Sequence, residues 1–188
     1  KMSSYSQLEK LVGQMIIAGF RGLHLAHNDQ IIGDISKYNL GGAILYDEDV
    51  TVVPHKKRNI ESPGQLKSLI RTLGSVAETP LFIAVDQEGG TVSRLKPRHG
   101  FPEIPSWNHI GNLDNVMETE YYAKTISESL AQCGINLNLA PVLDLDFGSR
   151  TAIGKSERAL STDPKKVVEH SKVFIRILKG NNIISCGK

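Results

Sequence analysis

Five short apolar segments constrain the fold of this chain more than any other feature. The pattern predicts strands at 15–20, 43–46, 81–85, 135–139 and 183–186. Their apolar residues follow one another directly, without the alternation that marks a strand with one face in water. Such continuous runs are typical of strands buried on both faces, as in parallel sheets covered by helices.

The segments between these strands have helical periodicity. We expect helices at 6–14, 29–39, 63–77, 117–133 and 164–179. Two of them begin with a capping residue followed by proline, at Ser62-Pro63 and Asp163-Pro164. These residues indicate a helix start, because the side-chain oxygen of the cap accepts a hydrogen bond from a free backbone N–H group and proline suits the first turn. Strands about 30–50 residues apart fit right-handed βαβ crossovers. The sequence therefore predicts an α/β fold, either a doubly wound sheet or a (β/α) barrel.

Composition excludes several classes of protein. The 188 residues are enough for one domain with a hydrophobic core, and 22 Lys+Arg against 20 Asp+Glu is too balanced for a dedicated nucleic-acid binder. No apolar run approaches about 18 residues, so we expect no membrane span, and we see no signal peptide. Cys133 and Cys186 do not form a disulfide framework, and we expect both in or near the core. We expect the basic run 55–58 to be a solvated loop.

Charged residues follow three of the five predicted strands. Asp86 follows the third strand, Asp144 and Asp146 follow the fourth, and Lys188 follows the fifth. In parallel α/β folds the active site lies at the carboxyl ends of the strands. The two longest connections also leave from these ends, and loops of that length are usually functional. We therefore place the candidate site there.

The segment VDQEGG (85–90) has several interpretations. Its Gly-Gly pair predicts a tight turn, and Asp86 could accept sugar hydroxyls, bind a metal or simply cap the turn. We predict no metal site, because residues two apart on a strand point to opposite faces and no third ligand is evident. Motifs for dinucleotides, P-loops and serine hydrolases are missing from the sequence.

Four motifs in order resemble the N-terminal domain of glycoside hydrolase family 3, in its bacterial β-N-acetylglucosaminidase (β-hexosaminidase) branch. They are FIAVDQEGGTVSRL (82–95) with the prolines at 102 and 105, GINLNLAPVLD (134–144), IGKSER (153–158) and STDP (161–164). The likeness runs from about residue 7 to residue 188. It implies a TIM-type (β/α) barrel, of which 1–188 would be the N-terminal portion, about five βα units of an incomplete barrel.

The resemblance implies roles for four residues. Asp86 would bind hydroxyls of the non-reducing terminal sugar, and Arg94, Arg158 and Lys188 would donate hydrogen bonds to it. Each has a structural alternative. Arg94 could hold the loop through Glu88, Arg158 could pair with Asp144 or Asp146, and Lys188 could be disordered because it is the last residue. Asp144 would support the site structurally.

The resemblance also implies an activity and what this chain lacks for it. The β-N-acetylglucosaminidase branch would remove terminal β-N-acetylglucosamine with retention, and the family usually continues KHFPGHG from the position of Lys188. Its catalytic His and nucleophilic Asp would then lie beyond residue 188, so we expect no catalytic residue here and an inactive isolated chain. Another exo-glycosidase, such as a β-glucosidase, and an inactive sugar-binding module are the alternatives.

Partners and location follow from the same resemblance. The substrate would be an oligosaccharide or a muropeptide of peptidoglycan recycling, with no cofactor. The compartment would be the cytoplasm, with a periplasmic or secreted location as the alternatives. Five parallel strands cannot close an eight-stranded barrel, and an open sheet edge invites pairing with another chain. We therefore expect self-association through the open edge.

Overall fold

The structure, a computed structural model, describes residues 4–188. It contains two compact units. The first comprises the chain up to Val85 with Cys133–Ile135, and the second comprises Asp86–Gln132 with Asn136–Lys188. The two are described separately below.

Three parallel strands form the centre of the first unit. They are β1 (Ile17–Gly19), β2 (Gly42–Leu45) and β5 (Phe82–Val85). The middle strand is β2, whose Ala43 pairs with Ala18 on one side and with Ile83 on the other. Both Ala43 and Ile83 are buried, as the apolar runs predicted.

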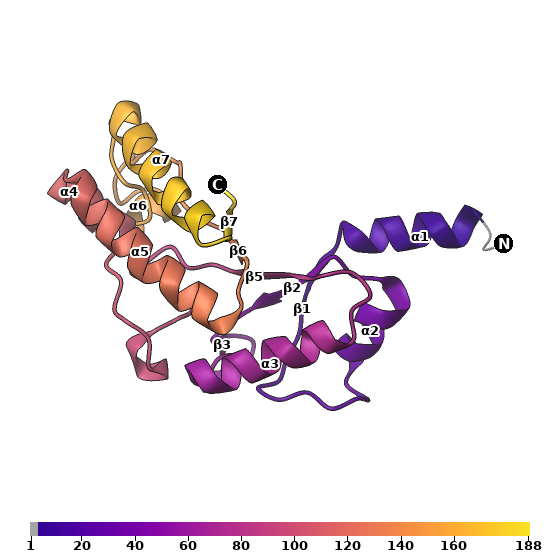
Figure 1. The fold of residues 1–188 in the computed structure, drawn as a ribbon. Helices are drawn as coiled ribbons and strands as arrows, with labels where there is room; N and C mark the ends of the chain where they lie inside the picture. Colours follow the sequence, from indigo (N-terminus) through magenta and orange to yellow (C-terminus); the bar gives the residue numbers. More distant parts are fainter. Residues whose placement is uncertain (1–3) are drawn as a thin grey trace. The chain divides into compact units, whose positions relative to one another are not determined.

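Helices α1 (Ser4–Gln14), α2 (Gln30–Tyr38) and α3 (Pro63–Ser75) complete this unit (Figure 1). The start of α3 confirms its capping signal, because Ser62 accepts a hydrogen bond from the backbone N–H of Gln65 and Pro63 occupies the first turn. One face of α3 buries four leucine and isoleucine side chains, at positions 66, 69, 70 and 73.

A short antiparallel hairpin, β3 (Glu48–Asp49) with β4 (Lys56–Lys57), includes part of the basic run 55–58 that we expected to be a solvated loop. The basic run is only partly solvated. Its two lysines are exposed, but Arg58 is half-buried, donates to the Phe20 carbonyl at 2.8 Å and lies 4.6 Å from the centre of the Tyr46 ring.

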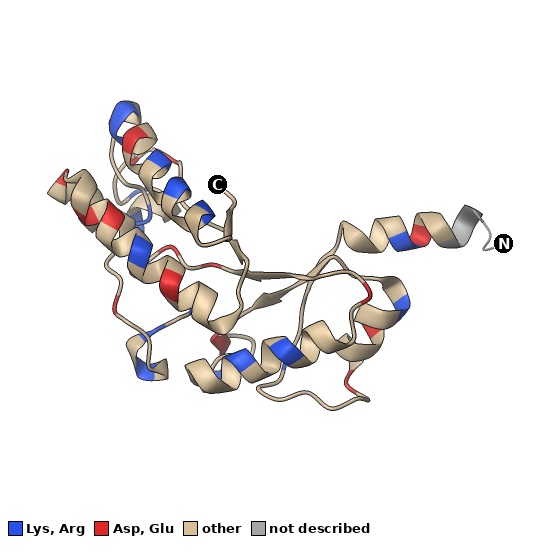
Figure 2. Cartoon of the chain, in the orientation of Figure 1, with Lys and Arg blue, Asp and Glu red and all other residues tan. Residues whose placement is uncertain are grey.

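The first unit exposes an apolar face on α1 and the segment after it. Leu11 is 61% exposed and Met15 is 85% exposed, and their neighbours at 8, 12, 16 and 17 are also open to solvent. Figure 2 shows how few charges α1 carries. Beside this face, Leu8, Val12, Ile16 and Tyr38 help to line a groove of about 680 Å³.

The second unit contains two short parallel strands and three main helices. The strands are β6 (Leu137–Asn138) and β7 (Ile184–Ser185), and the helices are α4 (Trp107–Leu113), α5 (Val116–Cys133) and α7 (Pro164–Gly180). Two smaller turns are a 3-10 helix at Pro97–His99 and α6 at Ala152–Lys155. In the strand pair, Leu137 lies opposite Ile184 and Asn138 opposite Ser185.

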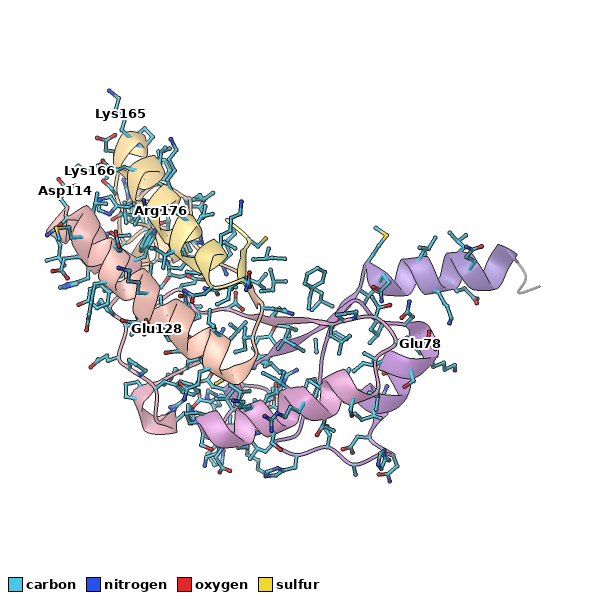
Figure 3. The ribbon with its side chains drawn as sticks, in the orientation of Figure 1. Glu78, Asp114, Glu128, Lys165, Lys166 and Arg176 are labelled. Carbon is cyan, nitrogen blue, oxygen red and sulfur yellow. The ribbon has the colours of Figure 1, made fainter. Side chains whose placement is uncertain are left out.

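Helices α5 and α7 lie side by side (Figure 1). The buried ring of His170 shares a 2.6 Å hydrogen bond with Thr119. At the end of α4, Asp114 forms an ion pair with Lys166 on the first turn of α7, with 2.6 Å between Asp114 Oδ2 and Lys166 Nζ (Figure 3). These polar contacts join the three helices, and the Trp107 ring meets Phe174 edge-on with ring centres 5.6 Å apart.

The observed elements confirm an α/β fold with parallel strands, and the strands described within residues 4–188 do not close a barrel. All five predicted strands are present; four are shorter than predicted, and β2 has the predicted length but begins and ends one residue earlier. The fourth strand, β6, ends at Asn138, one residue before its predicted end. Cys133 is buried as expected, whereas Cys186 is exposed. No helix in the described part of the chain is long and apolar enough to cross a membrane.

Candidate functional site

The loop after β5 is organised by the buried side chain of Gln87, which is 1% exposed. Its Oε1 accepts hydrogen bonds from the backbone N–H groups of Arg94 and Leu95, both at 2.9 Å, and its Nε2 donates to Ser93 Oγ at 3.3 Å. One amide side chain thus closes the loop and holds residues 86–88 near 93–95.

Asn138, at the end of β6, holds the same point from another element. Its Oδ1 accepts from the Gln87 N–H and its Nδ2 donates to the Gln87 carbonyl, each at 3.0 Å. The amide therefore satisfies both backbone polar groups of a buried residue, which would be costly to leave unpaired. This fixes the direction in which Asp86 and Glu88 leave the backbone.

The turn that follows confirms the prediction from the Gly-Gly pair. Gly89 and Gly90 have φ values of 105° and 54°, which favour glycine. A Cβ atom on Gly89 would lie 2.2 Å from the Pro105 carbonyl oxygen, and the Gly90 N–H donates to the Ile104 carbonyl. The loop can therefore pack against 104–106 only with glycine at these positions.

The two acidic residues of this loop share one cation. Lys188 Nζ lies 2.6 Å from Asp86 Oδ1 and 2.7 Å from Glu88 Oε1. Arg94 Nη2 lies 3.9 Å from the other oxygen of Asp86. The Asp86 side chain is 17% exposed and that of Glu88 is 2% exposed, so Asp86 is the more accessible carboxylate.

Arg158 forms a two-pronged ion pair with Glu88. Its Nε donates to Oε2 at 2.7 Å and its Nη2 donates to Oε1 at 2.9 Å. The hydrogen bond to Glu88 raises the pKa of Arg158 above its ordinary value, with smaller contributions from the charges of Asp86 and Asp144. The expected alternative, in which Arg158 pairs with Asp144 or Asp146, is wrong, because its bonded partner is Glu88.

Helix α4, which the sequence did not predict, helps to place Arg158. The Asn108 side chain donates to Asp146 Oδ2 and to the Ala159 carbonyl, both at 3.1 Å, and the backbone N–H of Asn108 donates to the Glu157 carbonyl. These bonds connect the two ends of the loop at 146–161 to one side chain. Asp146 therefore has a structural role in this loop.

Lys188 is anchored through its backbone. Its N–H donates to the Pro141 carbonyl at 3.1 Å, and its carbonyl accepts from the Leu143 N–H at 2.6 Å. Two residues earlier, the Cys186 N–H donates to the Asn138 carbonyl at 2.8 Å. The structure thus places this last residue through backbone hydrogen bonds to the segment that follows β6.

All four predicted residues, Asp86, Arg94, Arg158 and Lys188, therefore meet in one cluster of the second unit. The sequence reasoning missed the central place of Glu88. The signal that could have identified it is charge balance, because three cations need more than the single carboxylate of Asp86.

The cluster alternates hydrogen-bond donors and acceptors. Asp86 offers acceptor oxygens, while guanidinium and ammonium groups offer donors beside it, which suits a ligand that carries several hydroxyl groups. No group of three or more His, Cys, Asp or Glu within residues 4–188 is arranged to hold a metal ion. A separate hollow of about 570 Å³ borders the glycine turn and is lined by Gly90, Ser93 and His109 among others, but by none of the four predicted residues.

Comparison with known proteins places this arrangement in context. The family model described as "Glycosyl hydrolase family 3 N terminal domain" matches residues 7–188. A protein named beta-hexosaminidase from Nitrosomonas eutropha is 32% identical over 173 residues, covering 89% of this chain and 45% of its own length. One of the same name from Photobacterium profundum is 37% identical over 132 residues, covering 70% of this chain and 38% of its own. The chain thus spans less than half the length of these relatives.

Solved structures agree with the sequence comparison. A glycoside hydrolase family 3 beta-N-acetylglucosaminidase from Paenibacillus superposes with a TM-score of 0.84 at 28% identity, over 96% of this chain and 32% of that one. The beta-N-acetylhexosaminidase of Beutenbergia cavernae gives 0.79 at 26% identity, over 96% and 53%.

Proposed function

The chain belongs to the glycosyl hydrolase family 3 N-terminal domain family, and from that premise we propose that it forms the sugar-binding part of a glycoside hydrolase that removes terminal, non-reducing β-N-acetylglucosamine. Residues 1–188 would be the N-terminal portion of its (β/α) barrel. The substrate would be an oligosaccharide or a muropeptide. The names of the relatives support this choice of sugar.

The cluster around Asp86 carries the proposal. Asp86 would accept hydrogen bonds from hydroxyls of the terminal sugar, and Arg94, Arg158 and Lys188 would donate to its oxygens. The observation behind these roles is the bridging position of Lys188, 2.6 Å from Asp86 and 2.7 Å from Glu88. It brings residues from the ends of β5 and β7 to one point, where a sugar could meet both signs of charge.

The reacting groups would come from elsewhere in the barrel. A retaining glycosidase needs a nucleophile that forms the glycosyl-enzyme and a group that protonates the leaving oxygen. We assign neither role within this chain. In support, the shared region makes up less than half the length of the relatives from Nitrosomonas and Photobacterium.

A binding and turnover experiment on the chain tests this proposal. We expect N-acetylglucosamine to shift NMR signals of the 86–95 loop, glucose to do so more weakly, and Asp86→Ala to abolish the shifts. We expect no release of p-nitrophenol from its N-acetylglucosaminide by the chain alone. Turnover by the chain would refute the absence of catalytic groups, and a preference for glucose would favour a β-glucosidase.

A further inference from the structure

Glu88 occupies the centre of the charged cluster and pairs with two cations. Arg158 donates two hydrogen bonds to it, at 2.7 and 2.9 Å, and Lys188 Nζ forms an ion pair with it at 2.7 Å. We infer that Glu88 is a positioning residue, which holds Arg158 and Lys188 in place so that Asp86 keeps an oxygen available for the sugar. This inference rests on the proposed function.

The burial of the Glu88 side chain explains why it pairs with both cations. Its side chain is 2% exposed, whereas those of Arg158 and Lys188 are 24% and 33% exposed. An ionised carboxylate removed from water is costly unless it is paired and hydrogen-bonded. The two cations are accessible enough to meet water or a ligand, whereas the buried Glu88 carboxylate depends on these ion pairs to compensate its charge. The attraction of the buried Glu88 carboxylate therefore holds the charged groups of Arg158 and Lys188 in fixed positions.

This arrangement determines how far the carboxylate oxygens of Asp86 are taken up by internal ion pairs. The Lys188 ammonium group forms ion pairs with both carboxylates. Arg158 is also close enough to Asp86 for the negative charge of Asp86 to raise the pKa of Arg158. Without the Glu88 charge, both cations would be drawn to Asp86, the remaining carboxylate of the loop. Its oxygens would then be taken by internal ion pairs, and sugar hydroxyls would have to compete with them.

The fold of the loop does not depend on the Glu88 carboxylate. Gln87 and Asn138 hold the backbone through amide hydrogen bonds, and the Glu88 N–H donates to the Val92 carbonyl. A change confined to the Glu88 side chain should therefore move the cations while the loop keeps its course. This separates a positioning role from a purely structural one.

The variant Glu88→Gln in the full 188-residue chain tests the inference. A Gln side chain keeps the size of Glu but offers Arg158 one acceptor oxygen in place of two. We expect the Arg158 Nε–H signal, assigned by its loss in Arg158→Lys, to lose its protection from solvent exchange. We expect the Kd for N-acetylglucosamine to rise about ten-fold or more, since a hydrogen bond to a charged group accounts for at least that factor.

Asp49→Asn is the matched control. It removes another largely buried carboxylate that holds an arginine, Arg21, in the first unit. We expect it to leave the Arg158 signal and the sugar Kd unchanged, with folding of every variant followed by circular dichroism. A Kd in Glu88→Gln equal to that of the parent chain would overturn the inference, and so would an unchanged Arg158 signal.

A double-mutant cycle supplies the second criterion. If Glu88 acts through Arg158, then Glu88→Gln combined with Arg158→Gln should weaken binding by less than the product of the two single effects. Independent, multiplicative effects would contradict a positioning role. If the parent chain fails to bind N-acetylglucosamine, the proposed function fails and the sugar-related part of the inference with it. The Arg158 signal in Glu88→Gln then still decides whether Glu88 holds that cation.

Discussion

Lys188 Nζ lies 2.6 Å from Asp86 Oδ1, although the two residues are 102 positions apart in the chain. The contact depends on a backbone that is fixed at both ends, by the course of the 86–95 loop and by the bonds of Lys188 to Pro141 and Leu143. Because of this contact, a substitution of Lys188 tests the proposed site directly.

We predict that Lys188→Met weakens N-acetylglucosamine binding by about ten-fold or more, because it removes a charge-assisted donor while keeping an apolar stem of similar length. Lys179→Met, at an exposed position near the end of α7, is the control and should leave binding unchanged. Titration calorimetry would measure both. Equal affinities for the two variants would remove Lys188 from the site.

Much of this site was predictable from residue order, because strands that end in charged residues bring them to one edge of a parallel sheet. The family motifs added Arg94 and Arg158, which follow no strand directly. The partner of Arg158 was not predictable. It depends on α4 and Asn108, which shape the loop at 146–161, and such a long-range contact leaves no periodic signal in the sequence.

The fold, like the site, was predictable where local sequence patterns determine the structure and unpredictable where long-range contacts do. Buried strands and capped helices such as α3 follow from local apolar runs and capping residues. The short hairpin of β3 and β4 and the seven-residue α4 were missed, because neither has enough residues to establish a period. Cys186 looked buried within an apolar run, yet it is exposed.

Two glycines, one in the turn after β5 and one inside α2, lead to opposite predictions for stability. Gly89→Ala should destabilise the chain by at least ~2 kcal/mol and weaken sugar binding, because the φ of 105° is strained for alanine and its Cβ would meet the Pro105 carbonyl. Gly33→Ala, inside α2 with open space around its Cβ position, should stabilise the chain by ~0.5–1 kcal/mol. Urea denaturation would measure both. A neutral Gly89→Ala would show that the turn is not strained.

Acid stability should depend on Asp49. Hydrogen bonds from Arg21 and Thr51 hold the pKa of this carboxyl well below its usual range. A carboxyl whose pKa falls on folding stabilises the folded state above its unfolded pKa, about 3.9, and loses that effect as the pH drops toward the folded value. Asp49→Asn should therefore lower the Tm at pH 7 and lower it less at pH 3. Arg21→Gln should behave similarly, whereas a constant difference across this range would contradict the assignment.

The apolar face of α1 leads to the last prediction, which concerns association. Leu11 and Met15 are largely exposed, and β1 beside them is at the edge of the three-strand sheet in the first unit. Exposed apolar patches and free strand edges are sites of protein association, and a second copy of the chain would present the same surface. We therefore propose that the isolated chain self-associates through this face.

Sedimentation over a range of concentrations would measure this association. Leu11→Glu combined with Met15→Glu should shift the chain toward monomer, because each introduced carboxylate would have to leave water on pairing. Val53→Glu is the matched control, since Val53 is 92% exposed in the same unit but lies outside α1 and β1. If the parent chain is monomeric at every concentration, or if Val53→Glu dissociates it equally well, the α1 face is not the contact.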